Sequence, residues 1–249
     1  MLVAVAVWEI VVAARAARAV PHDDAWGRAA VYVRTRYQRG DLIVFAPEWA
    51  DPIGRLHLGD LIGLDMAGRM DDARYGRIWE VAIDGAQAPE LAGLVPVATW
   101  DEEGVAVRRY QRPAATIVAD VRDALATVTA VGGTPRLELA EVGFRPHRCV
   151  QVTPVANKPA RLTFPQLALG TELVGYVGIA DVFTRRDERS PIRLDVEVAG
   201  AKVASVTAGV EDGWVRFRAP TREGMADVTF VASASAPNKL ICFAAEARR

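Results

Sequence analysis

The feature that most constrains the fold is a series of short β-rich runs in the second half of the chain. The runs recur about every ten residues and are separated by joints rich in glycine, proline and asparagine. Evenly spaced strands with turn signals and no helical periodicity are typical of a sandwich or jelly roll. We therefore predict an antiparallel β-sandwich over residues 134–249. Its strands are expected at Leu137–Val142, Cys149–Thr153, Arg161–Phe164, Leu173–Val177, Arg193–Val198, Lys202–Thr207, Trp214–Arg218, Ala226–Ala232 and Leu240–Ala245.

A different pattern precedes these runs and predicts an α/β domain over residues 21–133. Helical and strand-like segments alternate, which is typical of a parallel sheet covered by helices, so a Rossmann-like layer domain is expected. The domain boundary is placed near Gly133. The expected elements are a helix starting at Pro21–Trp26 with Asp23 or Asp24 as its cap, a strand at Asp41–Pro47, helices at Pro52–Asp60 and Leu64–Tyr75, a strand at Arg77–Ile83, an edge strand at Val105–Tyr110 and a helix at Thr116–Val131.

The first twenty residues form an apolar segment with a single early acid. Leu2–Trp8 and Ile10–Ala14 are apolar, Glu9 lies between them, and Arg15 and Arg18 follow. The run is shorter than the roughly 20 residues of a bilayer span and lacks the basic start of a secretory signal. Three interpretations stay open: the outer end of a membrane helix, an atypical signal or anchor, and a helix packed on the domain. The first two predict an extracytoplasmic (periplasmic), membrane-anchored protein.

The two cysteines, Cys149 and Cys242, fall in an early strand and in the last strand of the expected sandwich. Terminal strands of a jelly roll are often neighbours, so a disulfide between these cysteines is plausible in an oxidising compartment. The alternative is two buried free thiols, because a reduced cysteine behaves as a small apolar residue.

Composition and motifs exclude several function classes. Basic and acidic residues nearly cancel at 30 against 31, which argues against nucleic-acid binding. Three histidines and two cysteines are too few for repeated zinc motifs, so no metal site and no cofactor are expected. No glycine-rich phosphate loop follows Phe45, and neither G-x-S-x-G nor H-E-x-x-H occurs. The sequence therefore predicts no catalytic residue.

The richest cluster of polar side chains follows the first core strand. Ligands of open α/β sheets bind at the carboxyl ends of the strands, and a tryptophan face with planar charged groups suits a sugar. The alternative is an ordinary helix start, with Asp51 as the cap and Pro52 in the first turn. The candidate ligand-binding residues are Glu48, Trp49, Asp51, Arg55, His57 and Asp60.

A second candidate lies in the charged segment Asp181–Arg189 of the sandwich. Arg185 and Arg186 can fork onto an anionic or sugar ligand, or they can pair with neighbouring acids in a solvated loop. Trp214 is expected in the core.

Several short patterns resemble known proteins. The pieces Pro21–Trp26, Gly40–Pro47 and Arg77–Val81 resemble the extracytoplasmic soluble region of bacterial polyprenyl-phosphate-sugar glycosyltransferases of the dolichyl-phosphate-mannose mannosyltransferase-like type. This resemblance covers roughly residues 8–112. It implies no catalytic residue here, because that family's catalytic acids lie on loops between membrane helices. Leu173–Phe183 and Ala199–Phe217 resemble a galactose-binding-like jelly roll.

Together these observations predict a non-catalytic extracytoplasmic module that binds carbohydrate or assists cell-envelope glycan transfer. Its expected partners are a glycan or a polyprenyl-linked sugar and, through the N-terminal segment, a membrane. One alternative is a carbohydrate-active enzyme, a glycosyltransferase or hydrolase with its site at Glu48–Asp60. A second alternative is a structural envelope protein.

Overall fold

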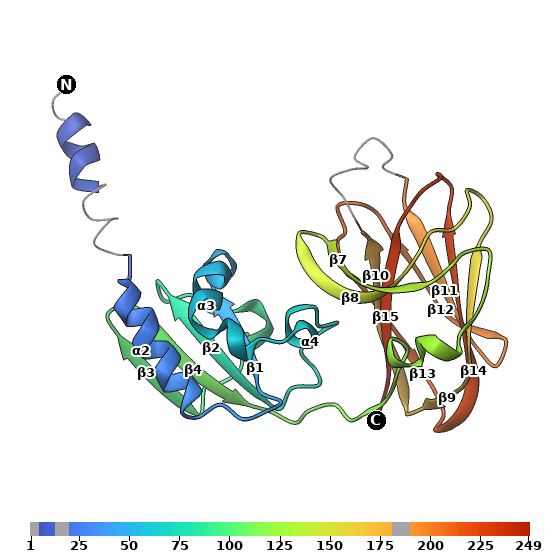
Figure 1. The fold of residues 1–249 in the computed structure, drawn as a ribbon, viewed down its shortest axis with the longest axis horizontal. Coiled ribbons are helices and arrows are strands. Elements are labelled where there is room, and N and C mark those ends of the chain that lie inside the picture. Colours follow the sequence, from blue (N-terminus) through green and yellow to red (C-terminus); the bar gives the residue numbers. More distant parts are fainter. Residues whose placement is uncertain (1–4, 13–19, 181–189) are drawn as a thin grey trace. The chain divides into compact units, whose positions relative to one another are not determined.

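The fold comes from a computed structural model, which describes residues 5–12, 20–180 and 190–249. The chain divides into two compact units (Figure 1). The first unit comprises Met1–Met66 and Tyr75–Ala114, and the second comprises Ala67–Arg74 and Ala115–Arg249. Each unit therefore contains two separate stretches of sequence.

The first unit contains a four-stranded sheet in the order β1-β2-β4-β3. Its strands are β1 (Leu42–Ala46), β2 (Arg77–Ile83), β3 (Ala98–Glu102) and β4 (Val105–Gln111). Only β1 and β2 pair in parallel, and the other two pairs are antiparallel. A parallel Rossmann-like sheet is therefore not what forms. The tight turn at Glu103 and Gly104, both with positive φ, returns the chain as a hairpin and makes β4 an internal strand, not the expected edge strand.

Two helices of the first unit match their predicted positions. Helix α2 (Asp23–Arg34) buries an apolar stripe that includes Trp26 and Val33, as its helical spacing predicts. Its N-cap is His22 rather than an aspartate, and no side chain caps it; Asp23 and Asp24 lie in the first turn, where acids favour the helix dipole. Helix α3 (Asp51–Leu58) is preceded by the 3-10 turn η1 (Glu48–Ala50) and followed by η2 (Gly59–Leu61).

The helix predicted over Leu64–Tyr75 is much shorter in the structure. Helix α4 comprises only Leu64–Ala67. Gly68 follows, and the main-chain carbonyl groups of residues 68, 69, 70 and 73 accept hydrogen bonds from Arg148, His147, Trp214 and Ala115 instead of continuing a helix. Tertiary contacts therefore override the local pattern here.

The second unit is an antiparallel β-sandwich of the jelly-roll type, as predicted. One sheet has six strands in the order β13-β10-β15-β8-β7, with β5 also paired to β15; the other has five in the order β12-β11-β14-β9-β6. Phe164, Phe230 and Phe243 pack together between the sheets. The strands are β5 (Ile117–Asp120), β6 (Thr129–Val131), β7 (Arg136–Val142), β8 (Arg145–Val152), β9 (Ala160–Leu169), β10 (Glu172–Ile179), β11 (Ile192–Val198), β12 (Ala201–Ala208), β13 (Val215–Pro220), β14 (Gly224–Ala234) and β15 (Ile241–Arg248).

The helix predicted over Thr116–Val131 is wrong. The structure has β5, the short 3-10 helix η4 (Asp123–Thr127) and β6 in its place. Strand β5 pairs with β15 and β6 pairs with β9, so this segment adds one strand to each sheet of the sandwich. The second unit consequently resumes at Ala115 rather than near Gly133.

Cys149 on β8 and Cys242 on β15 form a disulfide between neighbouring strands, with a Cα–Cα distance of 5.6 Å. At the N-terminus, residues 5–12 are helical, and the rest of the predicted anchor lies largely outside the described residues. Among residues 5–12, 20–180 and 190–249, no helix has the length and apolar character needed to cross a bilayer.

Candidate functional site

The predicted ligand cluster occupies one short stretch of the first unit but does not form one site. Glu48 and Trp49 lie in η1, and Trp49 is 63% exposed. Asp51, Arg55 and His57 lie on α3, and Asp60 lies in η2. The other two predicted residues, Arg185 and Arg186, lie outside the described part of the chain.

Two acids of this cluster, Asp51 and Asp60, are paired with separate arginines. Asp51 accepts a hydrogen bond from Arg55 one helical turn later, at 2.5 Å. Asp60 accepts one from Arg34 at the end of α2, also at 2.5 Å, and this bond lowers the pKa of Asp60 below its usual value. The two carboxylates therefore bind different arginines and share no partner.

His57 contacts the beginning of α2. Its Nε2 lies 3.0 Å from Oδ1 of Asp23, and its ring stacks on Trp26 at a centroid distance of 6.4 Å. It is therefore paired with neither Asp51 nor Asp60.

Hollows do occur beside the predicted cluster, along the solvent side of α2. Two depressions of about 610 and 500 Å³ share Arg28 and Val31, and we call the pair the α2 trough. The first is lined by Arg28, Val31, Tyr32, Thr35, Arg36 and Trp100. The second is lined by Asp23, Asp24, Gly27, Arg28, Val31 and His57. His57 is therefore the predicted residue that lines the trough.

One wall of the α2 trough is a stack of planar groups. The rings of Tyr32 and Trp100 lie nearly parallel, 5.4 Å apart, and the Arg36 guanidinium lies 4.0 Å from the centre of the Tyr32 ring. Nη1 of Arg36 also donates to the hydroxyl of Thr35 at 2.8 Å, which fixes the guanidinium plane. The wall therefore offers aromatic carbon next to oriented N–H donors.

Arg28 holds the middle of the trough. Its guanidinium pairs with Glu102 at 2.8 Å and with Glu103 at 2.6 Å, at the end of β3. These pairs join α2 to the β3–β4 turn and place two carboxylates beside the arginine. The carboxylates can accept hydrogen bonds from hydroxyl groups of a ligand, and the guanidinium group can donate hydrogen bonds to them.

The residues of this wall were not predicted. Arg28 and Tyr32 are four residues apart on α2, so the sequence does contain the signal that they share one helix face; Arg36 follows four residues later, just after the helix ends. Trp100 joins them because β3 pairs with β4, and the short connection at Gly104 is the local sign of that pairing.

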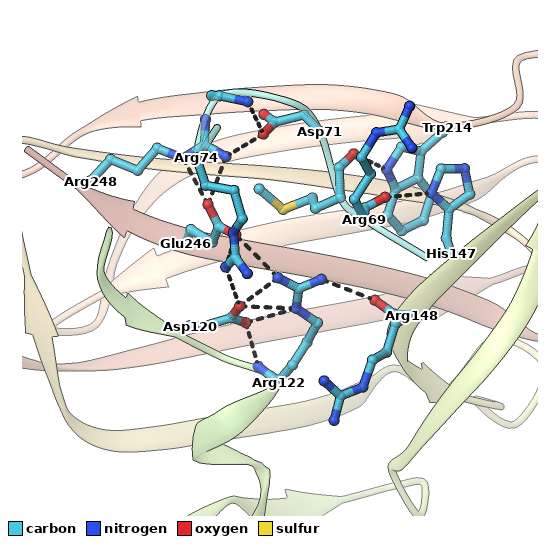
Figure 2. Close-up of polar contacts among 12 residues, drawn as sticks. Arg69, Asp71, Arg74, Asp120, Arg122, His147, Arg148, Trp214, Glu246 and Arg248 are labelled. Atoms are coloured by element: carbon cyan, nitrogen blue, oxygen red, sulfur yellow. Dashed lines mark hydrogen bonds and ion pairs between the residues drawn. The ribbon is translucent and has the colours of Figure 1, made fainter. Parts of the chain in front are cut away.

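The second unit contains a buried ionic cluster (Figure 2). Glu246 is 1% exposed and accepts hydrogen bonds from Arg74, Arg122 and Arg248 at 2.7, 3.1 and 2.7 Å. Asp120 pairs with Arg122 and Arg74, and Asp71 pairs with Arg248 at 2.7 Å. Three arginines thus balance three carboxylates.

The pKa values in the cluster reflect this pairing. Burial alone would raise the pKa of Asp120, but hydrogen bonds from Arg122 outweigh burial and lower it. Burial would lower the pKa of Arg122, and Asp120 raises it instead. Both groups are therefore charged at neutral pH, and the cluster is a neutral, closed network.

Residues 67–74, which we call the strap, supply Asp71 and Arg74 to this cluster. Beside it, the rings of Tyr176, Trp214 and His147 form a stack on the same sheet, with successive centroids 5.9 and 4.4 Å apart. Trp214 is half-buried in this stack and donates from Nε1 to the Met70 carbonyl at 3.1 Å. Trp214 also packs against the small core cluster around the disulfide, so its expected burial is partly confirmed. The main core between the sheets is reached by Phe217 of β13 instead.

His147 has one unpaired nitrogen. Its Nδ1 lies 3.1 Å from the carbonyl oxygen of Arg69, while the buried Nε2 has no partner. Burial, reinforced by the charges of Arg69 and Arg145, lowers the pKa of His147 to about 4. The ring is neutral at pH 7 and donates from Nδ1.

His147 should make the second unit less stable in mild acid. Its folded pKa lies below the unfolded value of 6.5, so the unfolded chain takes up the proton first as the pH falls. The stability present above pH 6.5 should drop by about 2 kcal/mol at pH 5 and about 3 kcal/mol near pH 4. Urea unfolding at pH 7.5 and pH 5 measures this loss. His147→Gln should remove most of the difference, and equal pH dependence in both proteins would contradict the assignment.

Metal ligation has no support in the described residues. In residues 5–12, 20–180 and 190–249, no group of three or more His, Cys, Asp or Glu side chains is arranged to hold an ion.

Comparisons with known proteins identify no family. No protein-family model matches the chain, and no curated protein matches it. Solved structures with partial similarity include carbohydrate-binding modules. A CBM51 module of Clostridium perfringens GH95, in complex with methyl-galactose, is 9% identical with a TM-score of 0.36, covering 47% of this chain and 92% of that one.

Two further modules have similarly low sequence identities and TM-scores. The C-terminal CBM6 of LamC from Zobellia galactanivorans is 10% identical with a TM-score of 0.35, covering 50% of this chain and 94% of its own. A module of Cellvibrio mixtus lichenase 5A, in complex with cellotriose, is 12% identical with a TM-score of 0.37, covering 54% and 98%. Similarity of this size assigns no ligand to this chain. None of these comparisons supports the expected glycosyltransferase-like region.

Proposed function

We propose that this chain is a non-catalytic carbohydrate-binding module and that the α2 trough is its binding site. The observation that carries the proposal is the stack of Arg36, Tyr32 and Trp100 along the wall of a hollow of about 610 Å³. A sugar ring has apolar C–H faces that pack on aromatic carbon, and its hydroxyl groups bond to charged planar groups. The trough presents both kinds of surface side by side.

The enzyme alternative is disfavoured by the separation of the acids. Catalysis at Glu48–Asp60 requires an acid and a base near one reacting bond. Asp51 instead pairs with Arg55, His57 with Asp23, and Asp60 with Arg34.

The finer part of the proposal places the module outside the cytoplasm, next to cell-envelope glycan or a polyprenyl-linked sugar during its transfer. The Cys149–Cys242 disulfide supports this location, because disulfides persist in oxidising compartments. Alkylation of free thiols in intact cells before lysis shows whether Cys149 and Cys242 are oxidised in the cell. Complete alkylation of both cysteines in rapidly quenched cells would place the protein in a reducing compartment and contradict the location.

Replacing Trp100 by alanine should weaken glycan binding about tenfold or more. The change removes one face of the aromatic wall, and truncated tryptophans at binding sites are among the costliest losses. The measurement is a glycan array that includes envelope polymers and polyprenyl-linked sugars, followed by titration of each hit with the full chain.

The matched control is Trp49→Ala, which removes an exposed tryptophan that lines neither depression. Trp100→Phe should retain most of the affinity because it keeps an aromatic face. Loss of binding in Trp49→Ala but not in Trp100→Ala would move the site to the predicted loop. Absence of saturable binding by the wild-type chain would contradict the proposal and favour a structural envelope protein.

A further inference from the structure

The strap is held on the outer face of the six-stranded sheet by main-chain carbonyl groups and by charged side chains. This face points away from the sandwich core, because Phe243 and Ala245 of β15 point inward and the alternating residues Glu246 and Arg248 point outward. The carbonyl oxygens of Gly68, Arg69, Met70 and Ala73 lie 2.7–3.1 Å from Arg148 N, His147 Nδ1, Trp214 Nε1 and Ala115 N, respectively. Two of these partners are side chains and two are backbone amides.

Three side-chain positions of the strap are specified as well. A Cβ atom added to Gly68 would lie 2.8 Å from the backbone nitrogen of Arg148, so a larger residue does not fit there. Asp71 bonds to Arg248 at 2.7 Å, and Arg74 bonds to Glu246 at 2.7 Å (Figure 2). The face therefore selects a peptide with the spacing Gly-x-x-Asp-x-x-Arg.

The way the strap is held favours reversible docking. Of its side chains, only Met70 is a buried apolar group of any size, while the residues from Asp71 to Arg74 are half-buried. Opening the strap exposes Glu246 and Arg248 to water, which replaces the lost hydrogen bonds, so opening costs less than deleting one partner of a pair that stays buried. When the strap leaves, the ionic cluster loses one acid, Asp71, and one arginine, Arg74. The cluster residues that stay remain balanced: Asp120 and Glu246 against Arg122 and Arg248.

We propose that the outer face of the six-stranded sheet is a peptide-binding surface whose occupant in this structure is the chain's own strap, bound in cis. When the strap opens, the same face binds an extended peptide of that spacing in trans. The ligand class is an extended peptide that carries a glycine, an acid three positions later and an arginine three positions after that. This proposal is independent of glycan binding at the α2 trough.

Binding in trans can be measured with a synthetic peptide of residues 66–75, MAGRMDDARY, carrying a fluorescent label. The full chain with Met70→Ser, Asp71→Ser and Arg74→Ser should bind this peptide saturably, because its strap no longer occupies the face. The wild-type chain should bind at least about tenfold more weakly, since only the fraction with an open strap is competent. Fluorescence anisotropy reports both affinities.

The matched control is a peptide in which Asp71 and Arg74 are exchanged, MAGRMRDADY, which has the same composition and net charge. It should bind at least about tenfold more weakly than the native peptide, because each charge meets its like on the sheet. Equal binding of the two peptides, equal binding to wild type and variant, or no binding to a variant with wild-type circular dichroism would overturn the proposal.

Hydrogen exchange of the wild-type chain tests strap opening without any substitution. The amide of Arg148, which donates to Gly68, should exchange at a lower opening free energy than the amides of the β10–β15 ladder. If Arg148 exchanges only at the rate of that ladder, the strap opens only on unfolding and the proposal is wrong.

Discussion

Glu246→Ala should lower the free energy of unfolding of the β-sandwich by about 3–5 kcal/mol. Glu246 is 1% exposed and bonds to Arg74, Arg122 and Arg248. Its removal leaves two nearly buried guanidinium groups, those of Arg122 and Arg248, each with one carboxylate fewer. Guanidinium-induced unfolding monitored by circular dichroism measures the loss.

Two variants separate the cost of buried charge from a general effect of substitution. Glu172 lies on β10 of the same sheet and bonds to Arg218, whose side chain is 67% exposed. Glu172→Ala should therefore cost no more than about 1 kcal/mol. The double variant Glu246→Leu/Arg248→Leu should be less destabilised than the sum of its single variants, since the two charges leave together. A Glu246→Ala loss as small as that of Glu172→Ala would show that the cluster is well hydrated.

Loss of the disulfide should be comparably destabilising. Cys149 and Cys242 are 93 residues apart. A crosslink of that span lowers the entropy of the unfolded chain and so raises the free energy of unfolding by about 4–5 kcal/mol in the loop-entropy model. We expect the variant Cys149→Ala/Cys242→Ala to unfold roughly 10–15 °C lower than wild type. Thermal unfolding followed by circular dichroism measures the difference.

A reducing agent provides the internal control for this prediction. It should lower the unfolding temperature of the wild-type protein toward that of the double variant, and it should leave the double variant unchanged. Wild-type protein that is insensitive to complete reduction would contradict a stabilising role for the Cys149–Cys242 bond.

The β-sandwich was predictable because its signals are local. The hairpin of β11 and β12 turns at Ala199 and Gly200, both with positive φ, where the sequence places a glycine between two β-rich runs. The α/β pattern of the first unit was less informative, since alternation of helix and strand does not specify strand direction. Only the short connection at Gly104 reveals that β3 and β4 are antiparallel.

The site was predictable only in part, for the same reason. His57 was predicted as a ligand-binding residue and lines the trough, but its partner Asp23 lies on another helix. The sequence of the segment Thr116–Val131 predicts a helix, yet the segment forms β5 and β6, which pair with strands of two different sheets. The strap gives no sign in sequence of the surface on which it docks. Contacts between distant segments decide all three cases.

The central position of β15 has a consequence for biosynthesis. Strand β15 (Ile241–Arg248) pairs with β5, β8 and β10. The six-stranded sheet therefore lacks its central strand until residue 248 has left the ribosome. The first unit, complete at residue 114, can fold while the rest of the chain is still being translated. The strands of the second unit must wait with their apolar faces exposed, which makes this interval the one in which a chaperone has most to protect.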